Sequence, residues 1–83
     1  MIPQDQNYLS KKIEELTALR KSISLDLKVI AEATKIPTQT LKNIETRNFD
    51  KLPPYPIGVS FIKQYSFVIE KELSKPKNSK INR

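Results

Sequence analysis

Residues 27–45, LKVIAEATKIPTQTLKNIE, contain two short amphipathic helical patterns separated by a proline turn. Asp26 stands before the first pattern, where its carboxylate can accept hydrogen bonds from the free N–H groups of a helix end. Pro37 disfavours helical backbone at Ile36 and so places the turn there. The small side chain of Ala31 allows the two helices to cross closely. This arrangement is typical of a helix-turn-helix, although any small helical bundle can produce the same spacing.

Helical periodicity continues on both sides of this stretch, and no alternating strand pattern is present. Before it, regularly spaced apolar residues predict a helix from Tyr8, with Arg20 on its solvent face. After it, Asn48 can cap a single turn over 49–52, and a proline-rich connector leads into a long helix over about 57–73. We therefore predict an all-α fold, a compact bundle of five helices in which the fourth is a single turn.

The folded domain is expected to span residues 8–73. Residues 1–7 form a polar segment that we expect to be a disordered lead-in. Residues 74–83, SKPKNSKINR, carry four basic side chains and no acidic one, which predicts a disordered basic tail. Such a tail also fits an anionic membrane surface.

The chain has 83 residues, 15 basic and 9 acidic side chains, a net charge of +6, one glycine, and neither cysteine nor histidine. It therefore lacks thiol nucleophiles, imidazole bases, the usual zinc ligands and a glycine-rich phosphate loop. We expect a binding protein rather than an enzyme, with no cofactor, no metal and no small-molecule substrate. The N-terminus has no secretory pattern and no apolar stretch is long enough to span a membrane, so we expect a cytoplasmic location.

The long final helix carries two apolar stripes. One stripe comprises Gly58, Ile62, Tyr65 and Ile69, and the other comprises Ile57, Phe61 and Val68. Phe67 and Val59 belong to neither stripe. A small core can absorb one stripe, so the second indicates extra burial, either inside the domain or against a partner.

Several motifs stand in order along the chain: AEATKI at 31–36, Leu-x-x-Ile-Glu at 41–45, Phe-x-x-Leu-Pro at 49–53, and FIKQY at 61–65. In this combination the sequence resembles the cytoplasmic N-terminal domain of the RodZ family of bacterial cell-shape proteins. The resemblance covers about Leu9 to Leu73. It implies a variant of the Cro and lambda-repressor type of helix-turn-helix.

The resemblance also implies a partner. In the RodZ family, two aromatic positions near the start of the last helix contact the actin-like protein MreB. Carried over, these positions fall on Ile57 and Phe61, with Lys63 nearby, so Ile57 stands where the family has an aromatic residue. The implied role is an adaptor in cell-shape maintenance, held at the inner face of the membrane if an anchor follows in the full-length protein. The alternative is that Ile57 and Phe61 simply belong to the core.

A second hypothesis is sequence-specific binding of double-stranded DNA by a small transcriptional regulator. Its candidate residues are Thr38, Gln39, Thr40, Lys42, Asn43 and Arg47. Gln and Asn can pair with adenine edges, and Lys can contact guanine or phosphate. The net charge of +6 adds attraction to phosphate. Glu45 reduces the basic character of this helix, and its polar face could equally be a solvated surface.

Overall fold

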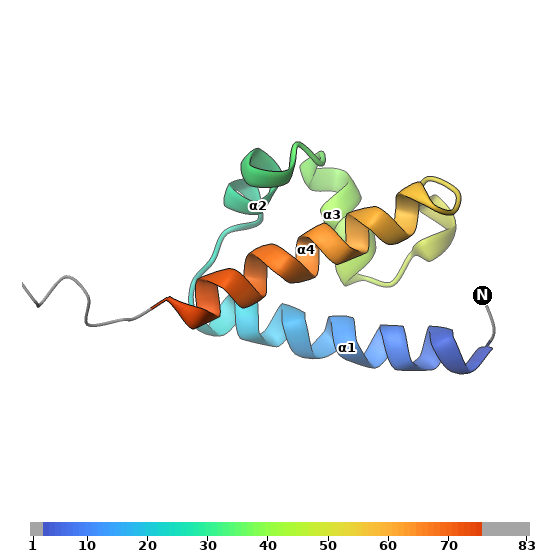
Figure 1. Ribbon diagram of the computed structural model, residues 1–83, viewed down its shortest axis with the longest axis horizontal. Helices are drawn as coiled ribbons and strands as arrows, with labels where there is room; N and C mark the ends of the chain where they lie inside the picture. Colours follow the sequence, from blue (N-terminus) through green and yellow to red (C-terminus); the bar gives the residue numbers. More distant parts are fainter. Residues whose placement is uncertain (1–2, 76–83) are drawn as a thin grey trace, which may run out of the picture.

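The computed structural model describes residues 3–75 (Figure 1). Its elements are α1 (Pro3–Ser22), α2 (Leu27–Thr34), α3 (Thr38–Glu45), the 3₁₀ turn η1 (Phe49–Lys51) and α4 (Ile57–Ser74). The two long helices, α1 and α4, run side by side in the same general direction, and α2 and α3 pack on them from one side. The described residues form no strand, so the all-α prediction is confirmed.

The predicted count of five helices is wrong, because the expected fourth helix is only a 3₁₀ turn. The N–H of Lys51 bonds to the carbonyl of Asn48 at 3.0 Å, and the N–H of Leu52 bonds to that of Phe49 at 3.1 Å. The Asn48 side chain makes no capping hydrogen bond. Pro53 holds Leu52 in extended backbone, so no further helical turn can follow.

The first helix begins at Pro3, before the predicted start at Tyr8. Residues 3–7 are therefore helical, where a disordered lead-in was expected. Proline is well suited to the first helical position, because its φ is already helical and the N–H it lacks would have no partner there. At the other end, α4 includes Ser74, which was expected to begin the tail. The rest of the predicted lead-in, residues 1–2, and of the tail, residues 76–83, lie outside the described residues.

The two helices of the helix-turn-helix form as predicted. The Asp26 side chain accepts a hydrogen bond from the N–H of Lys28 at the start of α2. At its end, Lys35 adopts a left-handed conformation with φ of 64°, and its N–H bonds to the carbonyl of Ala31. Pro37 then precedes α3 directly.

The core contains residues from every α-helix. Its buried members are Ile13, Leu16, Leu27, Ile30, Ile36, Leu41, Ile44, Ile62, Tyr65 and Ile69. The first apolar stripe of α4, which includes Gly58, is thus buried as predicted. The second stripe divides: Phe61 and Val68 are half-buried against the core, whereas Ile57 is exposed. None of the helices within residues 3–75 is long and apolar enough to cross a membrane.

Candidate functional site

A largely buried ion pair fixes the C-terminal end of α3. The guanidinium of Arg20, in α1, donates to both carboxylate oxygens of Glu45, with distances of 2.6 Å and 3.0 Å. Its third contact is the carbonyl of Leu25 at 2.8 Å, in the connection between α1 and α2. The side chains of Arg20 and Glu45 are only 11 % and 10 % exposed. The prediction that Arg20 lies on the solvent face is therefore wrong.

Tyr65 extends this pair into a network across three helices. Its hydroxyl, on α4, donates to Glu45 at 2.8 Å and lies 3.0 Å from the hydroxyl of Thr17 on α1. Burial, together with the neighbouring Glu45 charge, raises the pKa of Tyr65. Burial alone lowers the pKa of Arg20, but the hydrogen bonds and charge of Glu45 outweigh it, so the pKa stands above its usual value. The network thus joins α1, α3 and α4 with all its charges paired.

The buried Tyr65 hydroxyl predicts a specific loss of stability in alkali. Unfolded Tyr65 loses its proton near pH 10, whereas the folded chain keeps it to higher pH. The free energy of unfolding should therefore fall above about pH 10, by up to about 1.4 kcal/mol per pH unit from this residue alone. Denaturation experiments above about pH 10 should show that the difference in the free energy of unfolding between the wild type and Tyr65→Phe decreases as the pH rises. A constant difference would contradict the prediction.

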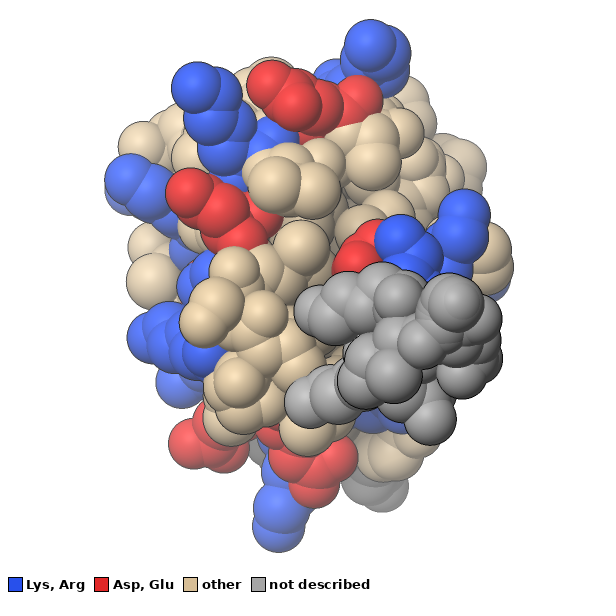
Figure 2. All heavy atoms as spheres, turned by 90° about the vertical axis from the view of Figure 1, so that its left-hand side faces the viewer, with Lys and Arg blue, Asp and Glu red and all other residues tan. Residues whose placement is uncertain are grey.

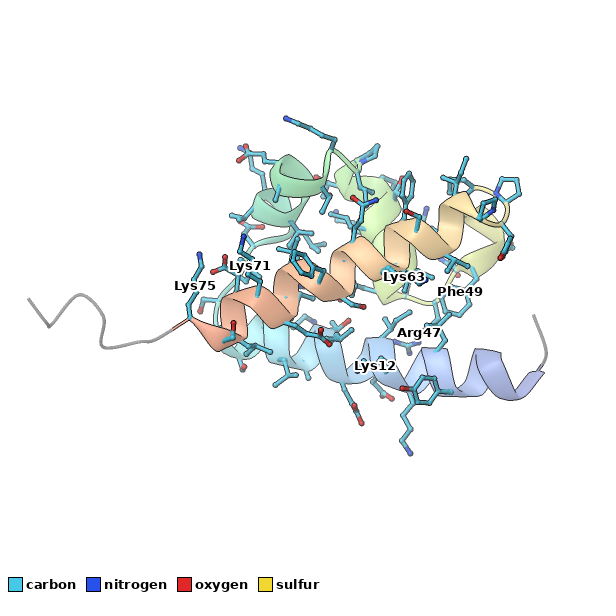
Figure 3. All side chains as sticks on the ribbon, viewed as in Figure 1. Lys12, Arg47, Phe49, Lys63, Lys71 and Lys75 are labelled. Atoms are coloured by element: carbon cyan, nitrogen blue, oxygen red, sulfur yellow. The ribbon has the colours of Figure 1, made fainter. Side chains whose placement is uncertain are left out.

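The predicted DNA-contacting residues are brought together only in part. Gln39 and Lys42 are exposed on α3, whereas Asn43 is half-buried. The side-chain amide nitrogen of Gln39 lies 3.5 Å from the side-chain oxygen of Asn43. Thr38 and Thr40 are half-buried. Arg47 lies beyond the end of α3 (Figure 3), in left-handed backbone with φ of 61°. Its guanidinium is turned back onto the carbonyl of Glu45 at 2.9 Å.

The predicted protein-docking residues on α4 differ in exposure. Ile57, at the first position of the helix, is 52 % exposed. Phe61 follows one turn later and is half-buried against the core. Lys63 is exposed, but it borders a separate hollow with Phe67. Ile57 and Phe61 therefore form one apolar edge at the start of α4, which we call the candidate docking edge, and Lys63 borders a different hollow.

Phe67, which belongs to neither apolar stripe of α4, is exposed. Its side chain is 64 % exposed and lines a hollow between α2 and α4 of about 550 Å³. On the end of the molecule shown in Figure 2, basic and acidic side chains are intermixed, so this end presents no uniformly basic face among the described residues. The described residues also contain no group of three or more acidic side chains placed to hold a metal ion.

Comparison with known proteins identifies the class of this domain. Residues 15–70, more than half of the chain, match the helix-turn-helix domain family. The chain therefore belongs to this family, as the arrangement of α2 and α3 indicates. No significant match is found among curated proteins or among solved structures.

Proposed function

We propose that this chain is a non-catalytic, cytoplasmic adaptor domain similar to that of RodZ, and that it binds an MreB-like actin homologue through Ile57 and Phe61. Membership of the helix-turn-helix family and the motif resemblance support this proposal. The basic tail would add attraction to an anionic membrane surface.

The observation that carries the proposal is the exposure of Ile57. Fully burying an isoleucine side chain contributes about 1.5–3 kcal/mol, and about half of this side chain is still in contact with water. Ile57 sits at the start of a long helix and follows a proline-rich connector, so it is held in a fixed position. Phe61 continues the same edge. An apolar edge carried on a helix suits a protein partner, because the backbone that presents it is already ordered before binding.

Replacing Ile57 by alanine should weaken binding to MreB about tenfold, because a central apolar anchor is shortened. The affinity can be measured by titration calorimetry with purified MreB. Phe61→Ala is less informative, since Phe61 also packs on the core. Leu19→Ala is a matched control, because Leu19 is 41 % exposed on α1. Equal affinities for wild type and Ile57→Ala would refute the docking assignment.

DNA binding by α3 is the second candidate, and the Arg20–Glu45 pair favours it. Glu45 is the one acidic residue within α3, and its charge is neutralised inside the domain. The remaining charge on α3 is that of Lys42, with Arg47 just beyond the helix end. The recognition face is therefore more basic than the sequence alone indicates.

If α3 reads DNA, the double variant Gln39→Ala, Asn43→Ala should lose about 1–3 kcal/mol of preference for its selected site over random duplex for each bidentate contact removed. Binding would be measured with and without residues 75–83, at about 150 mM salt, because nonspecific phosphate contacts are already weakened at that salt concentration. Gln64→Ala serves as a control amide on α4. Unselective binding that disappears with the tail would exclude α3 as a reading helix.

A further inference from the structure

A groove runs between the end of α2 and the outer side of α4. We call it the α2–α4 groove, and its main lining residues are Ala33, Thr34, Lys63, Phe67, Val68 and Lys71. Its volume of about 550 Å³ is within the range of ligand-sized clefts. The groove does not include Ile57 or Phe61, so it is a surface separate from the candidate docking edge.

Phe67 gives the groove an apolar centre. It is 64 % exposed, whereas Val68 beside it is half-buried against the core. An aromatic side chain of this size left in water is a large unburied apolar area, and aromatic residues are enriched where proteins bind one another. Phe67 is not needed for the core, because Ile62, Tyr65 and Ile69 already supply the buried face of α4.

Two lysines flank this centre. Lys63 and Lys71 stand four residues before and four residues after Phe67, so the helical period places the three residues along one ridge of α4. Within residues 8–75, neither lysine forms an ion pair. Glu72 also borders the groove, but Lys75 pairs with it at 2.9 Å. Figure 3 shows Lys71 and Lys75 near the C-terminal end of α4 and Lys63 closer to its middle. The groove is therefore apolar at its centre and positive along its length.

We propose that the α2–α4 groove binds an acidic, amphipathic helix of a partner protein. Lys63 and Lys71 are eight residues apart, or about 12 Å along the axis of α4. A matching helix would carry two carboxylates about eight residues apart, with a large apolar residue midway between them to cover Phe67. The concave shape suits a rod and not a flat lipid surface. Duplex DNA would satisfy the lysines but would leave Phe67 uncovered.

The test is selection of a displayed library of randomised helical peptides against the whole chain, followed by fluorescence anisotropy with the most enriched peptide. The enriched sequences should carry the carboxylate–apolar–carboxylate pattern. Phe67→Ser and the double variant Lys63→Glu, Lys71→Glu should each weaken binding about tenfold or more. Leu19→Ser and the double variant Lys11→Glu, Lys21→Glu on α1 are matched controls for the apolar and the charge change, and should bind like the wild type. Thermal unfolding would verify that every variant is folded.

Three results would overturn the proposal: no enrichment, enrichment of basic or uncharged peptides, or peptide binding that is unaffected by the changes at Phe67 and the two lysines. The groove would be assigned to lipid instead if no peptide is enriched and the chain sediments with vesicles of phosphatidylserine and phosphatidylcholine in a way that depends on Phe67. MreB is absent from these measurements, so their outcome is independent of the candidate docking edge at Ile57 and Phe61.

Discussion

Glu45→Ala should lower the free energy of unfolding by about 3–5 kcal/mol, the usual cost of removing one partner of a buried ion pair. The Arg20 guanidinium would keep its charge while only 11 % of its side chain reaches solvent. The Tyr65 hydroxyl would lose its acceptor at 2.8 Å. An 83-residue domain has a total stability of about 4–12 kcal/mol, so this one change removes a large part of it.

Urea denaturation followed by circular dichroism measures the effect of Glu45→Ala. The matched control is Glu70→Ala, because Glu70 pairs with Lys12 at 3.7 Å on the surface, with side chains 55 % and 41 % exposed. That change should alter stability by no more than about 0.5–1 kcal/mol. A second variant, Arg20→Met with Glu45→Leu, should recover much of the loss, since no charge is then left unpaired. Similar losses for Glu45→Ala and Glu70→Ala would mean that the pair is not effectively buried.

Gly58→Ala should destabilise the domain by about 1–3 kcal/mol, the usual cost of overpacking, although the same change in an exposed helix interior stabilises by about 1 kcal/mol. Gly58 lies in the first turn of α4 and is buried. A Cβ atom at this position would collide with the carbonyl oxygen of Pro53. That oxygen belongs to the backbone of the connector, so relief requires the connector or the start of α4 to move.

The control for Gly58→Ala is Ser60→Ala, which also introduces alanine into this helix turn, but at an exposed position where a Cβ atom is already present and only the hydroxyl is removed. Ser60→Ala should be neutral or slightly stabilising, by no more than about 0.7 kcal/mol. Movement of the connector would also be visible as chemical-shift changes at Ile57. A Gly58→Ala variant as stable as the wild type would show that the contact with Pro53 can relax without cost.

Much of the fold could be predicted because its signals are local. Asp26 and Pro37 stand where they begin α2 and α3, and the buried stripe of α4 follows from the helical period. The signals at the ends of the pattern are weaker. The start of α1 at Pro3 precedes the apolar periodicity, and the single turn after Asn48 is too short for periodicity to distinguish an α-helix from a 3₁₀ turn.

The Arg20–Glu45 pair could not be predicted, because it depends on how α1 and α3 approach each other. The two residues are 25 positions apart, and each alone resembles an ordinary charge on a helix surface. The only available signal was the position of Glu45 at the end of the Leu-x-x-Ile-Glu motif. A partner for it had to be identified from three-dimensional packing.

Of the candidate docking residues, Ile57 and Phe61 fall on one edge, since they are one helical turn apart. Their different exposure was not visible in the sequence, because it depends on how Phe61 packs against the folded core. The informative feature of the sequence was that Phe67 lies outside both apolar stripes of the final helix. In the folded chain this large apolar residue lines the groove between α2 and α4.

The use of glycine in this chain has a consequence for which substitutions it tolerates. Ser24, Lys35 and Arg47 all hold left-handed backbone with φ of 57–64°, a conformation that costs residues with a Cβ about 1–2 kcal/mol. The sole glycine stands instead in a helix, where the backbone suits any residue but the space does not. This reverses the common pattern: we expect glycine to be accepted at the three left-handed turn positions, whereas any side chain at Gly58 meets the carbonyl oxygen of Pro53.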